Sequence, residues 1–155
     1  MVININSGSD YFLIIITHFN NFKKKRKMEA TKQKTLYERL GGANGITAIV
    51  DDIIEAHMIN PNIMARFLPV KEDVAHFAQV RQHLIEFLSA GSGGSEQYTG
   101  KDMTTAHRGM NISEAEYMST IDDILASLEK HNIDEQSKKD VLAIAYSLKG
   151  TMIRV

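Results

Sequence analysis

Apolar residues repeat at helical spacing through most of the chain. Between residues 44 and 59, five of them fall at positions i, i+3, i+4, i+7 and i+8, which places them on one face of a helix. Three later segments carry similar stripes, and no segment alternates apolar and polar residues with a period of two. The pattern therefore predicts an all-α domain without a sheet. The four stripes are Ile46, Ile49, Val50, Ile53 and Ile54; Phe77, Val80, Leu84, Phe87 and Leu88; Tyr117, Ile121, Ile124, Leu125 and Leu128; and Val141, Leu142, Ile144, Ala145 and Leu148.

Capping residues mark where several of these helices begin. Residues 35–38 and 113–116 each place a threonine or serine three positions before a glutamate, which is the capping-box pattern. Asn44 and Asp134 can cap two further helices, because short polar side chains accept hydrogen bonds from the free N–H groups of a first turn. The capping boxes predict a short helix at the start of the domain and a long helix in its second half.

Helix-breaking residues divide the middle of the chain. The segment from about 73 to 90 predicts a third helix, and Gly-Ser-Gly-Gly at 91–94 ends it. A polar loop follows, and then a very short helix around 102–107. The two prolines, Pro61 and Pro69, fall between periodic segments, where helices usually stop. Helices of such unequal length around a long glycine-rich loop do not predict a symmetric four-helix bundle.

Composition narrows the class of protein. The chain has 155 residues, of which 43% are hydrophobic and 24% are charged, as expected for one soluble globular domain. It has no cysteine, which excludes disulfides, thiolate metal sites and covalently attached c-type haem. The formal net charge is -1, but basic residues concentrate at 23–27 and the rest of the chain is mildly acidic. Without a basic face on the domain, nucleic acid is not an expected partner.

Residues 1–33 differ from the rest, and we place the functional domain at 34–155. Their apolar run at 11–19 is far shorter than the ~20 residues of a membrane-spanning helix, and the basic run follows it, the reverse of a secretory signal. Three interpretations stay open: a disordered or partly helical tail, a weak membrane-surface anchor, or a segment that is not translated because Met28 is the natural start. We expect a cytoplasmic protein, monomeric or weakly dimeric, without a membrane partner.

Six histidines form the main inventory of reactive side chains. His57 and His131 lie near predicted helix ends, where a partly charged imidazole suits the helix dipole, so we expect structural roles for both. His76 and His83 lie seven residues apart on one helix face, and two such histidines can share a metal ion. The chain lacks the cysteines, the HExxH motif and the repeated Glu-x-x-His pairs that zinc or di-iron sites need, so this interpretation is not favoured.

His107 stands in a distinctive sequence. By spacing alone it fits a buried histidine with a backbone partner. However, the run YTGKDMTTAHRGMNISEAEY at 98–117 closely resembles the region around the proximal histidine of group I truncated haemoglobins, as do TLYERLGG at 35–42 and the glycine pair at 93–94. The resemblance covers residues 35–155. It implies a two-over-two globin fold, in which four main helices enclose a b-type haem and His107 is the proximal iron ligand.

The resemblance also implies the lining of the haem pocket. Phe67 matches the phenylalanine that packs flat on the porphyrin, and Met103, Ile112 and Tyr117 match wall positions on the proximal side. Each also fits an ordinary core position, which a haem role does not exclude because a bound haem is part of the core. The stretch 67–80 is several residues longer than is usual in the family. The match between this sequence and the distal helix of the family is therefore fixed only to within one helical turn.

The distal side departs from the family pattern. Ile54 stands where many members carry a tyrosine that points at bound dioxygen, Leu84 stands where many carry glutamine, and Val80 stands at the gate. A hydrogen-bond donor at such a place stabilises the charge on dioxygen by roughly 1–3 kcal/mol, and these three residues donate nothing. We therefore do not expect high-affinity oxygen storage or efficient dioxygenation of nitric oxide.

His83 falls where some group I members carry a histidine that binds the iron from the distal side. An apolar pocket with one histidine at its rim predicts the same arrangement here, with two histidines on the iron. Two alternatives stay open: His83 faces solvent, or it pairs with a haem propionate.

The function that we expect is binding of O2, CO or NO at the haem, with nitric oxide detoxification or redox turnover supported by an unidentified reductase. Whether the chain is an enzyme stays open, because only His83 qualifies as an acid or base. The alternatives are a haem-based gas or redox sensor, an electron-transfer protein with two histidine ligands, and an all-α protein-binding module without a cofactor.

Overall fold

The computed structural model of the protein describes residues 34–155, so the expectations about the tail and Met28 lie outside the described residues. Residues 35–155 form one compact unit of helices, with the longest connection at residues 92–102 between α5 and α6. In this part of the chain no strand forms, and the only extended pairing is an isolated bridge between Ile112 and Ile153. The helices are α2 (Leu36–Arg39), α3 (Gly42–Ile59), α4 (Met64–Glu72), α5 (Val74–Gly91), α6 (Met103–His107), α7 (Glu114–Lys130), α8 (Glu135–Ser147) and α9 (Lys149–Met152).

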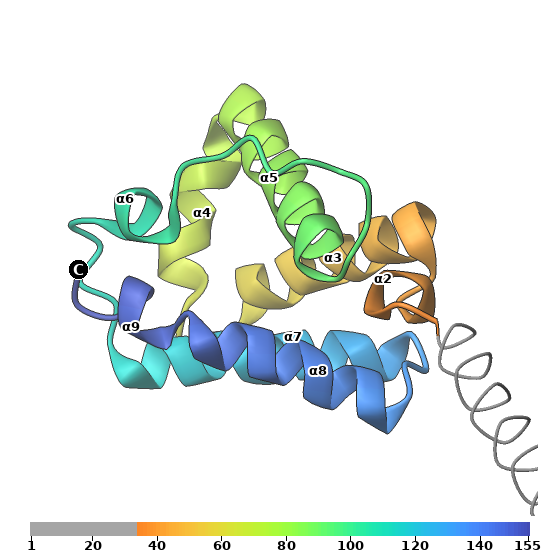
Figure 1. Ribbon diagram of the computed structural model, residues 1–155. Coiled ribbons are helices and arrows are strands. Elements are labelled where there is room, and N and C mark those ends of the chain that lie inside the picture. Colours follow the sequence, from red (N-terminus) through yellow and green to blue (C-terminus); the bar gives the residue numbers. More distant parts are fainter. Residues whose placement is uncertain (1–33) are drawn as a thin grey trace, which may run out of the picture. The chain divides into compact units, whose positions relative to one another are not determined.

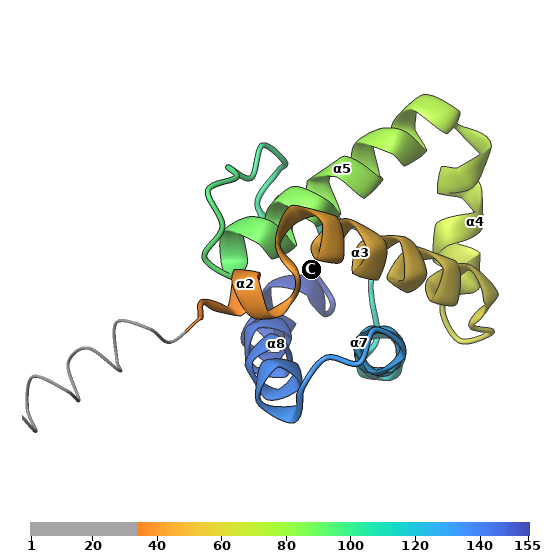
Figure 2. The ribbon, with the colours of Figure 1, turned by 90° about the vertical axis from the view of Figure 1, so that its right-hand side faces the viewer.

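Four long helices build the body in two layers. The helices α7 and α8 lie side by side, and α3 and α5 cross above them in Figure 1. Figure 2 shows α7 end-on beside α8, with α3 between this layer and α5. The short helix α6 packs against α9. The arrangement confirms the all-α, two-over-two fold. Among the helices of residues 34–155, none has the length and apolar character needed to cross a membrane.

The core is centred on α3. All five residues of its predicted stripe are buried, with exposed fractions of 8% or less, and they pack with Leu40, Leu128 and Val141. The stripe of α5 behaves differently, because its five apolar residues are only half-buried. The core therefore lies between α3 and the layer of α7 and α8, and the inner face of α5 is the less completely covered wall.

Most helix starts follow the predicted caps. Both capping boxes form, and Asp134 accepts a hydrogen bond at the start of α8. The prediction for Asn44 is wrong, because α3 begins at Gly42, three residues earlier than an Asn44 cap would place its start. Its cap is Gly41, whose φ of +89° is in the left-handed region that glycine adopts without strain. The chain thus turns directly from α2 into α3.

The prediction that both prolines lie between helices is wrong for Pro69, which lies inside α4. An internal proline removes one backbone hydrogen bond and costs about 3 kcal/mol. The helix α4 has no buried residue of its own, so side-chain contacts with neighbouring elements hold it in place. The short terminal helix α9 was not predicted, because four residues carry no periodic signal.

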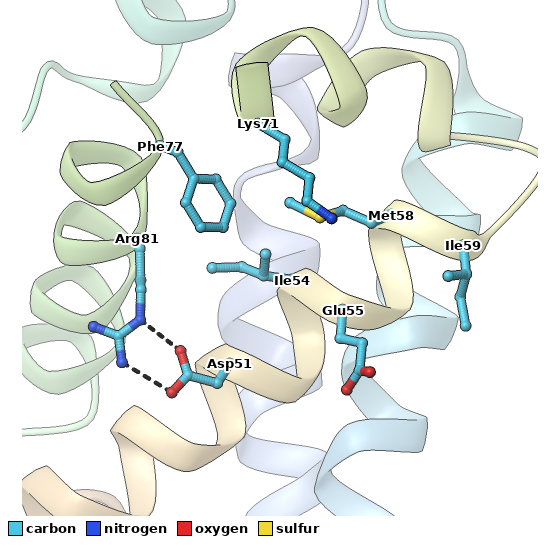
Figure 3. A pocket seen from close by; sticks show the side chains of 8 residues that line it. All are labelled: Asp51, Ile54, Glu55, Met58, Ile59, Lys71, Phe77 and Arg81. Carbon is cyan, nitrogen blue, oxygen red and sulfur yellow. Dashed lines mark hydrogen bonds and ion pairs between the residues drawn. The ribbon is translucent and has the colours of Figure 1, made fainter. Parts of the chain in front are cut away.

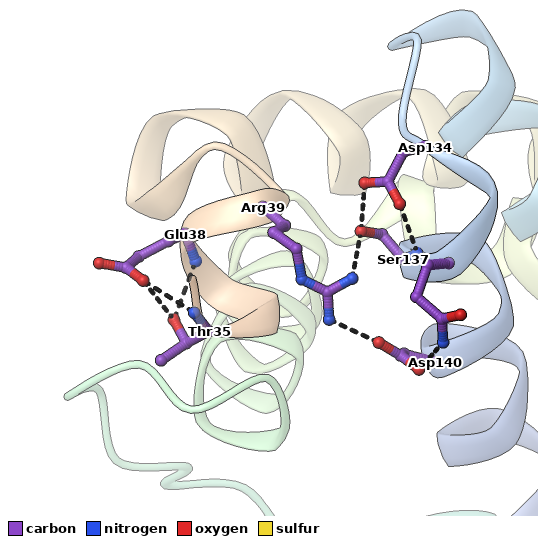
Figure 4. Close-up of polar contacts among 7 residues, drawn as sticks. Thr35, Glu38, Arg39, Asp134, Ser137 and Asp140 are labelled. Atoms are coloured by element: carbon purple, nitrogen blue, oxygen red, sulfur yellow. Dashed lines mark hydrogen bonds and ion pairs between the residues drawn. The ribbon is translucent and has the colours of Figure 1, made fainter. Parts of the chain in front are cut away.

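An arginine attaches the first helix to the body, as Figure 4 shows. Arg39 donates to the hydroxyl of Ser137 at 2.7 Å and pairs with Asp140 at 2.5 Å. Ser137 is fully buried and donates in turn to Asp134, the cap of α8. The network fixes α2 against the start of α8, and with it the tight turn that leads into α3.

Gly45 makes a closer backbone contact than any side chain allows. A Cβ atom there would lie 2.1 Å from the carbonyl oxygen of Leu40, whereas a Cβ at Gly91, in α5, would meet nothing within 4 Å. Gly45→Ala should therefore lower the free energy of unfolding by roughly 1–3 kcal/mol. The matched change Gly91→Ala should leave it unchanged or raise it by about 0.5 kcal/mol. Urea unfolding measures both, and equal stability of the two variants would contradict the close contact.

Candidate functional site

His107 ends the five-residue helix α6. The helix starts at Asp102, whose carboxylate accepts a hydrogen bond from the Thr105 backbone N–H at 2.9 Å. The Nδ1 atom of His107 lies 2.8 Å from the carbonyl oxygen of Met103. A carbonyl only accepts, so Nδ1 carries the proton and the lone pair of the imidazole is on Nε2. A neutral imidazole with this backbone partner is the usual form of a metal-binding histidine.

The C-terminal segment holds the loop that follows His107. Gly109, with φ of +81°, donates its N–H to the carbonyl of Val155 at 2.9 Å. The N–H of Arg154 donates to the carbonyl of Ile112 at 3.1 Å, beside the isolated bridge. The segment after α9 thus fixes the loop that carries the candidate iron ligand.

Arg66 holds the same loop from the opposite direction. From α4 it donates to the carbonyl of Met110 at 2.6 Å and to the carboxylate of Glu116 at 2.8 Å. The backbone N–H and hydroxyl of Ser113, and then Arg66, lower the pKa of Glu116 to about 2. Glu116 therefore stays negatively charged at neutral pH, and α4 is bound to the loop between α6 and α7.

The predicted pocket residues come from five helices and the loop before α7. Ile54 and Tyr117 are buried, with exposed fractions of 7% and 4%, and the Tyr117 hydroxyl donates to the carbonyl of Ala145. Leu84 packs against the core cluster that contains Ile54. The remaining apolar positions are half-buried: Phe67, Val80, Met103 and Ile112.

A buried histidine lies next to Phe67. The ring of His57 is 4.8 Å from that of Phe67, and its Nδ1 donates to the carboxylate of Asp123 at 2.9 Å. Asn60 donates to the same carboxylate. Burial lowers the pKa of His57 and outweighs the opposing effect of Asp123, so this histidine is neutral rather than partly charged as expected. These contacts fit the structural role predicted for His57. Its partner Asp123 lies 66 positions away, so the sequence around His57 does not indicate the pairing.

The other histidines within residues 34–155, His76, His83 and His131, are exposed or half-buried. His131 pairs with Asp52 at 2.7 Å, and His76 is exposed. His83 is half-buried, with its ring centre 6.0 Å from that of Tyr98. No cluster of three or more metal-binding side chains occurs in residues 34–155, so His76 and His83 gain no third ligand of that kind from this part of the chain.

A cavity of about 400 Å³ lies between α3, α4 and α5, as Figure 3 shows. The side chain of Ile54 points into it, and Arg81 closes one side through two hydrogen bonds to Asp51, at 2.6 and 2.8 Å. Neither His83 nor His107 lines it, so it is not the candidate metal site. Its other lining residues are Glu55, Met58, Ile59, Lys71 and Phe77.

Comparison with known proteins agrees with the fold. The model of the bacterial-like globin family matches residues 35–154. A group 1 truncated haemoglobin of Tetrahymena pyriformis is 30% identical over 122 residues, which cover 72% of this chain and 97% of the relative. A group 1 truncated haemoglobin of a Synechocystis species is 29% identical and covers 72% of this chain and 89% of its own.

Solved structures show the same fold. The crystal structure of truncated haemoglobin from Tetrahymena pyriformis, in its Fe(III) form, superposes with a TM-score of 0.71 at 24% identity, and covers 79% of this chain and all of that one. The two-over-two haemoglobin of a Synechococcus species, in the cyanomet state with covalently attached haem, gives a TM-score of 0.66 at 21% identity over 75% of this chain and 94% of its own.

The chain is a haem protein of the globin class. It belongs to the bacterial-like globin family, as a group I truncated globin, and its cofactor is a b-type haem. The residues present fit such a group, because the hydrogen bond of His107 to Met103 leaves Nε2 as a ligand atom and the neighbouring elements supply half-buried apolar side chains. The family resemblance seen in the motifs at 35–42 and 98–117 is thereby confirmed.

The buried histidine makes stability depend on pH. Because burial keeps the pKa of His57 below the value of about 6.5 in an unfolded chain, the unfolded state takes up this proton first as the pH falls. The contribution of His57 is therefore complete above about pH 6.5 and is lost on acidification. In urea unfolding, the stability advantage of the wild type over His57→Phe should shrink as the pH is lowered from about 7.5 to about 5. Parallel pH profiles would contradict the pKa shift.

The arginine clamp on the loop after α6 should control how firmly haem is held. Arg66→Met removes the hydrogen bonds to Met110 and Glu116, and we expect haem transfer to excess apomyoglobin to accelerate about fivefold, which corresponds to ~1 kcal/mol. Lys149→Met is the matched control. Lys149 forms an exposed ion pair at 3.6 Å with Glu114, which lies on α7 as Glu116 does. Equal transfer rates in both variants would show that the clamp does not reach the haem.

Proposed function

We propose that this globin binds a diatomic ligand, O2, CO or NO, at a haem b whose iron is held by Nε2 of His107. The observation that carries the proposal is the 2.8 Å contact between Nδ1 of His107 and the carbonyl of Met103. It sets the tautomer that a metal needs and fixes the ring, since Met103 is one helical turn earlier in α6. The haem supplies an iron that changes between ferrous and ferric states and binds small ligands.

Apolar side chains from both faces would form the walls of the site. Met103, Ile112 and Tyr117 come from the elements around α6 and α7, and Phe67 comes from α4. The hydroxyl of Tyr117 donates its hydrogen bond to the carbonyl of Ala145, so only the apolar ring of Tyr117 would face the pocket. Such walls exclude water and favour a neutral porphyrin face over a polar substrate.

Three of the predicted distal residues offer no hydrogen-bond donor. Ile54, Val80 and Leu84 are hydrocarbon side chains; Ile54 belongs to the core cluster, and Leu84 packs against that cluster. A ligand that gathers negative charge therefore receives no stabilisation from these three residues. This supports exchange of small ligands or electron transfer at the haem, rather than oxygen storage or efficient dioxygenation of nitric oxide.

His83 is the proposed second axial ligand. It lies on α5 one residue before Leu84, at the edge of the helix face that carries the distal positions. With His107 it would give an iron held by two histidines, and a diatomic ligand would then bind by displacing His83. Such an arrangement also suits electron transfer, which we keep as the second candidate function because no donor stabilises a bound ligand.

Optical spectra of the purified protein test the proposal. The wild type should show a Soret band that shifts on reduction and on addition of CO. In His107→Gly the proximal bond is lost, so the ferrous–CO spectrum should change and haem should dissociate at least tenfold faster; added imidazole should restore both. His131→Gln, which changes a surface histidine paired with Asp52, is the control and should resemble the wild type.

Two outcomes would contradict separate parts of the proposal. A His107→Gly protein that keeps its haem with unchanged axial coordination would exclude His107 as the ligand. A ferric low-spin spectrum that persists in His83→Ala would exclude His83 as the second ligand, while leaving ligand binding at the haem intact.

A further inference from the structure

The ring of Tyr98 packs against the candidate distal ligand, His83, in an edge-to-face arrangement. Tyr98 lies in the loop between α5 and α6, and its ring centre is 6.0 Å from that of His83, at an interplanar angle of 73°. It makes a similar contact with Phe87, at 5.3 Å and 80°. His83 and Phe87 are four residues apart and therefore neighbours on one face of α5. Edge-to-face contact is a favoured arrangement of aromatic rings, so Tyr98 and Phe87 form an aromatic seat beside the imidazole.

The position of Tyr98 does not depend on His83. Its hydroxyl donates to the carbonyl of Lys101 at 2.6 Å. The next residue, Thr99, donates its N–H and its hydroxyl to Glu86 on α5, at 3.0 and 2.7 Å. Gly100 leaves room for the ring, because a Cβ there would lie 2.3–2.7 Å from Tyr98 ring and hydroxyl atoms. The aromatic seat is therefore also held by contacts that do not involve the imidazole.

The same tyrosine reaches the helix of the proximal ligand. Lys101, which accepts its hydrogen bond, directly precedes Asp102, the cap of α6. The helix α6 ends in His107. Tyr98 is thus in contact with the candidate distal ligand through its ring and with the start of the proximal helix through its hydroxyl.

His83 has a choice of direction because it stands at the edge of the α5 stripe, about 100° around the helix axis from Leu84. The structure places the ring of His83 against the ring of Tyr98. We infer that Tyr98 is a positioning residue that holds His83 off the haem iron, and so sets the fraction of protein in which His83 is an iron ligand. The inference rests on the proposed haem function, and it assigns to the loop before α6 a control over ligand access.

Two substitutions of Tyr98 test the inference in the haem-loaded protein. Tyr98→Leu removes the ring edge, so the ratio of His83-bound low-spin iron to high-spin iron should rise roughly two- to tenfold, as seen by ferric optical and resonance Raman spectra. Binding of CO to the ferrous protein should slow correspondingly, because His83 must leave first. Tyr98→Phe keeps the ring edge and loses only the hydroxyl, so it should stay closer to the wild type than Tyr98→Leu.

Gly100 offers an independent route to the same change. Its backbone conformation is outside the left-handed region, so alanine fits the backbone, and the three atoms nearest to the added methyl group all belong to the Tyr98 side chain. Gly100→Ala should therefore displace the ring and raise the low-spin fraction in the same direction as Tyr98→Leu. In the double variant His83→Ala/Tyr98→Leu, the added low-spin signal should disappear.

The outcomes separate the two proposals. A low-spin fraction that stays constant or falls in Tyr98→Leu, with CO binding unslowed, would overturn the role of Tyr98, as would a low-spin signal that survives in the double variant. In both cases haem binding through His107 stands. A wild-type protein without a Soret band would overturn the proposed function, and with it this inference.

Discussion

The hydrogen bond from His107 to the carbonyl of Met103 is the contact on which the proposed chemistry depends. An imidazole has two nitrogens, and a free histidine distributes its proton between them. Fixing the proton on Nδ1 commits Nε2 to a single role and orients the ring about the helix that carries it. Because donor and acceptor are four residues apart in one helical turn, the geometry comes with the fold of α6 itself.

A helix of five residues cannot maintain that geometry alone, because a single turn is far below the length at which helices are stable in water. The structure supplies the missing support from distant parts of the chain. Arg66 on α4 holds the loop after α6, and the segment around Arg154 holds it from the C-terminal side. The surroundings of His107 are therefore built from non-local contacts around a short local motif.

Much of the fold was predictable from the sequence because its signals are local. The five-residue stripe of α3 and the capping boxes at 35–38 and 113–116 act within one or two helical turns, and all of them form. The start of α3 was misplaced because a left-handed glycine, Gly41, took the role expected of Asn44. The helical Pro69 was missed because its cost is balanced by contacts made elsewhere.

In the candidate site, too, local features were predictable from the sequence and contacts between distant residues were not. The motif around His107 carried its own family signal, so its identity was predictable, and the roles of His83 and the pocket residues stay predictions. The partner of His57 lies on α7 and that of Arg66 lies beyond α6, and no local pattern indicates either pairing. Tyr98 was part of the recognised motif, but its contact with His83 depends on a side-chain direction that periodicity leaves undetermined.

The helix α4 has consequences for how a large flat cofactor enters. It buries no residue of its own, contains a proline, and connects to its surroundings through Arg66 and Phe67. Elements with few buried contacts open at the lowest free-energy cost, and their amide hydrogens exchange with solvent earliest. Local unfolding of α4 would release the contacts of both Arg66 and Phe67 in one step. The cofactor could then enter beside α4 while the other helices stay folded.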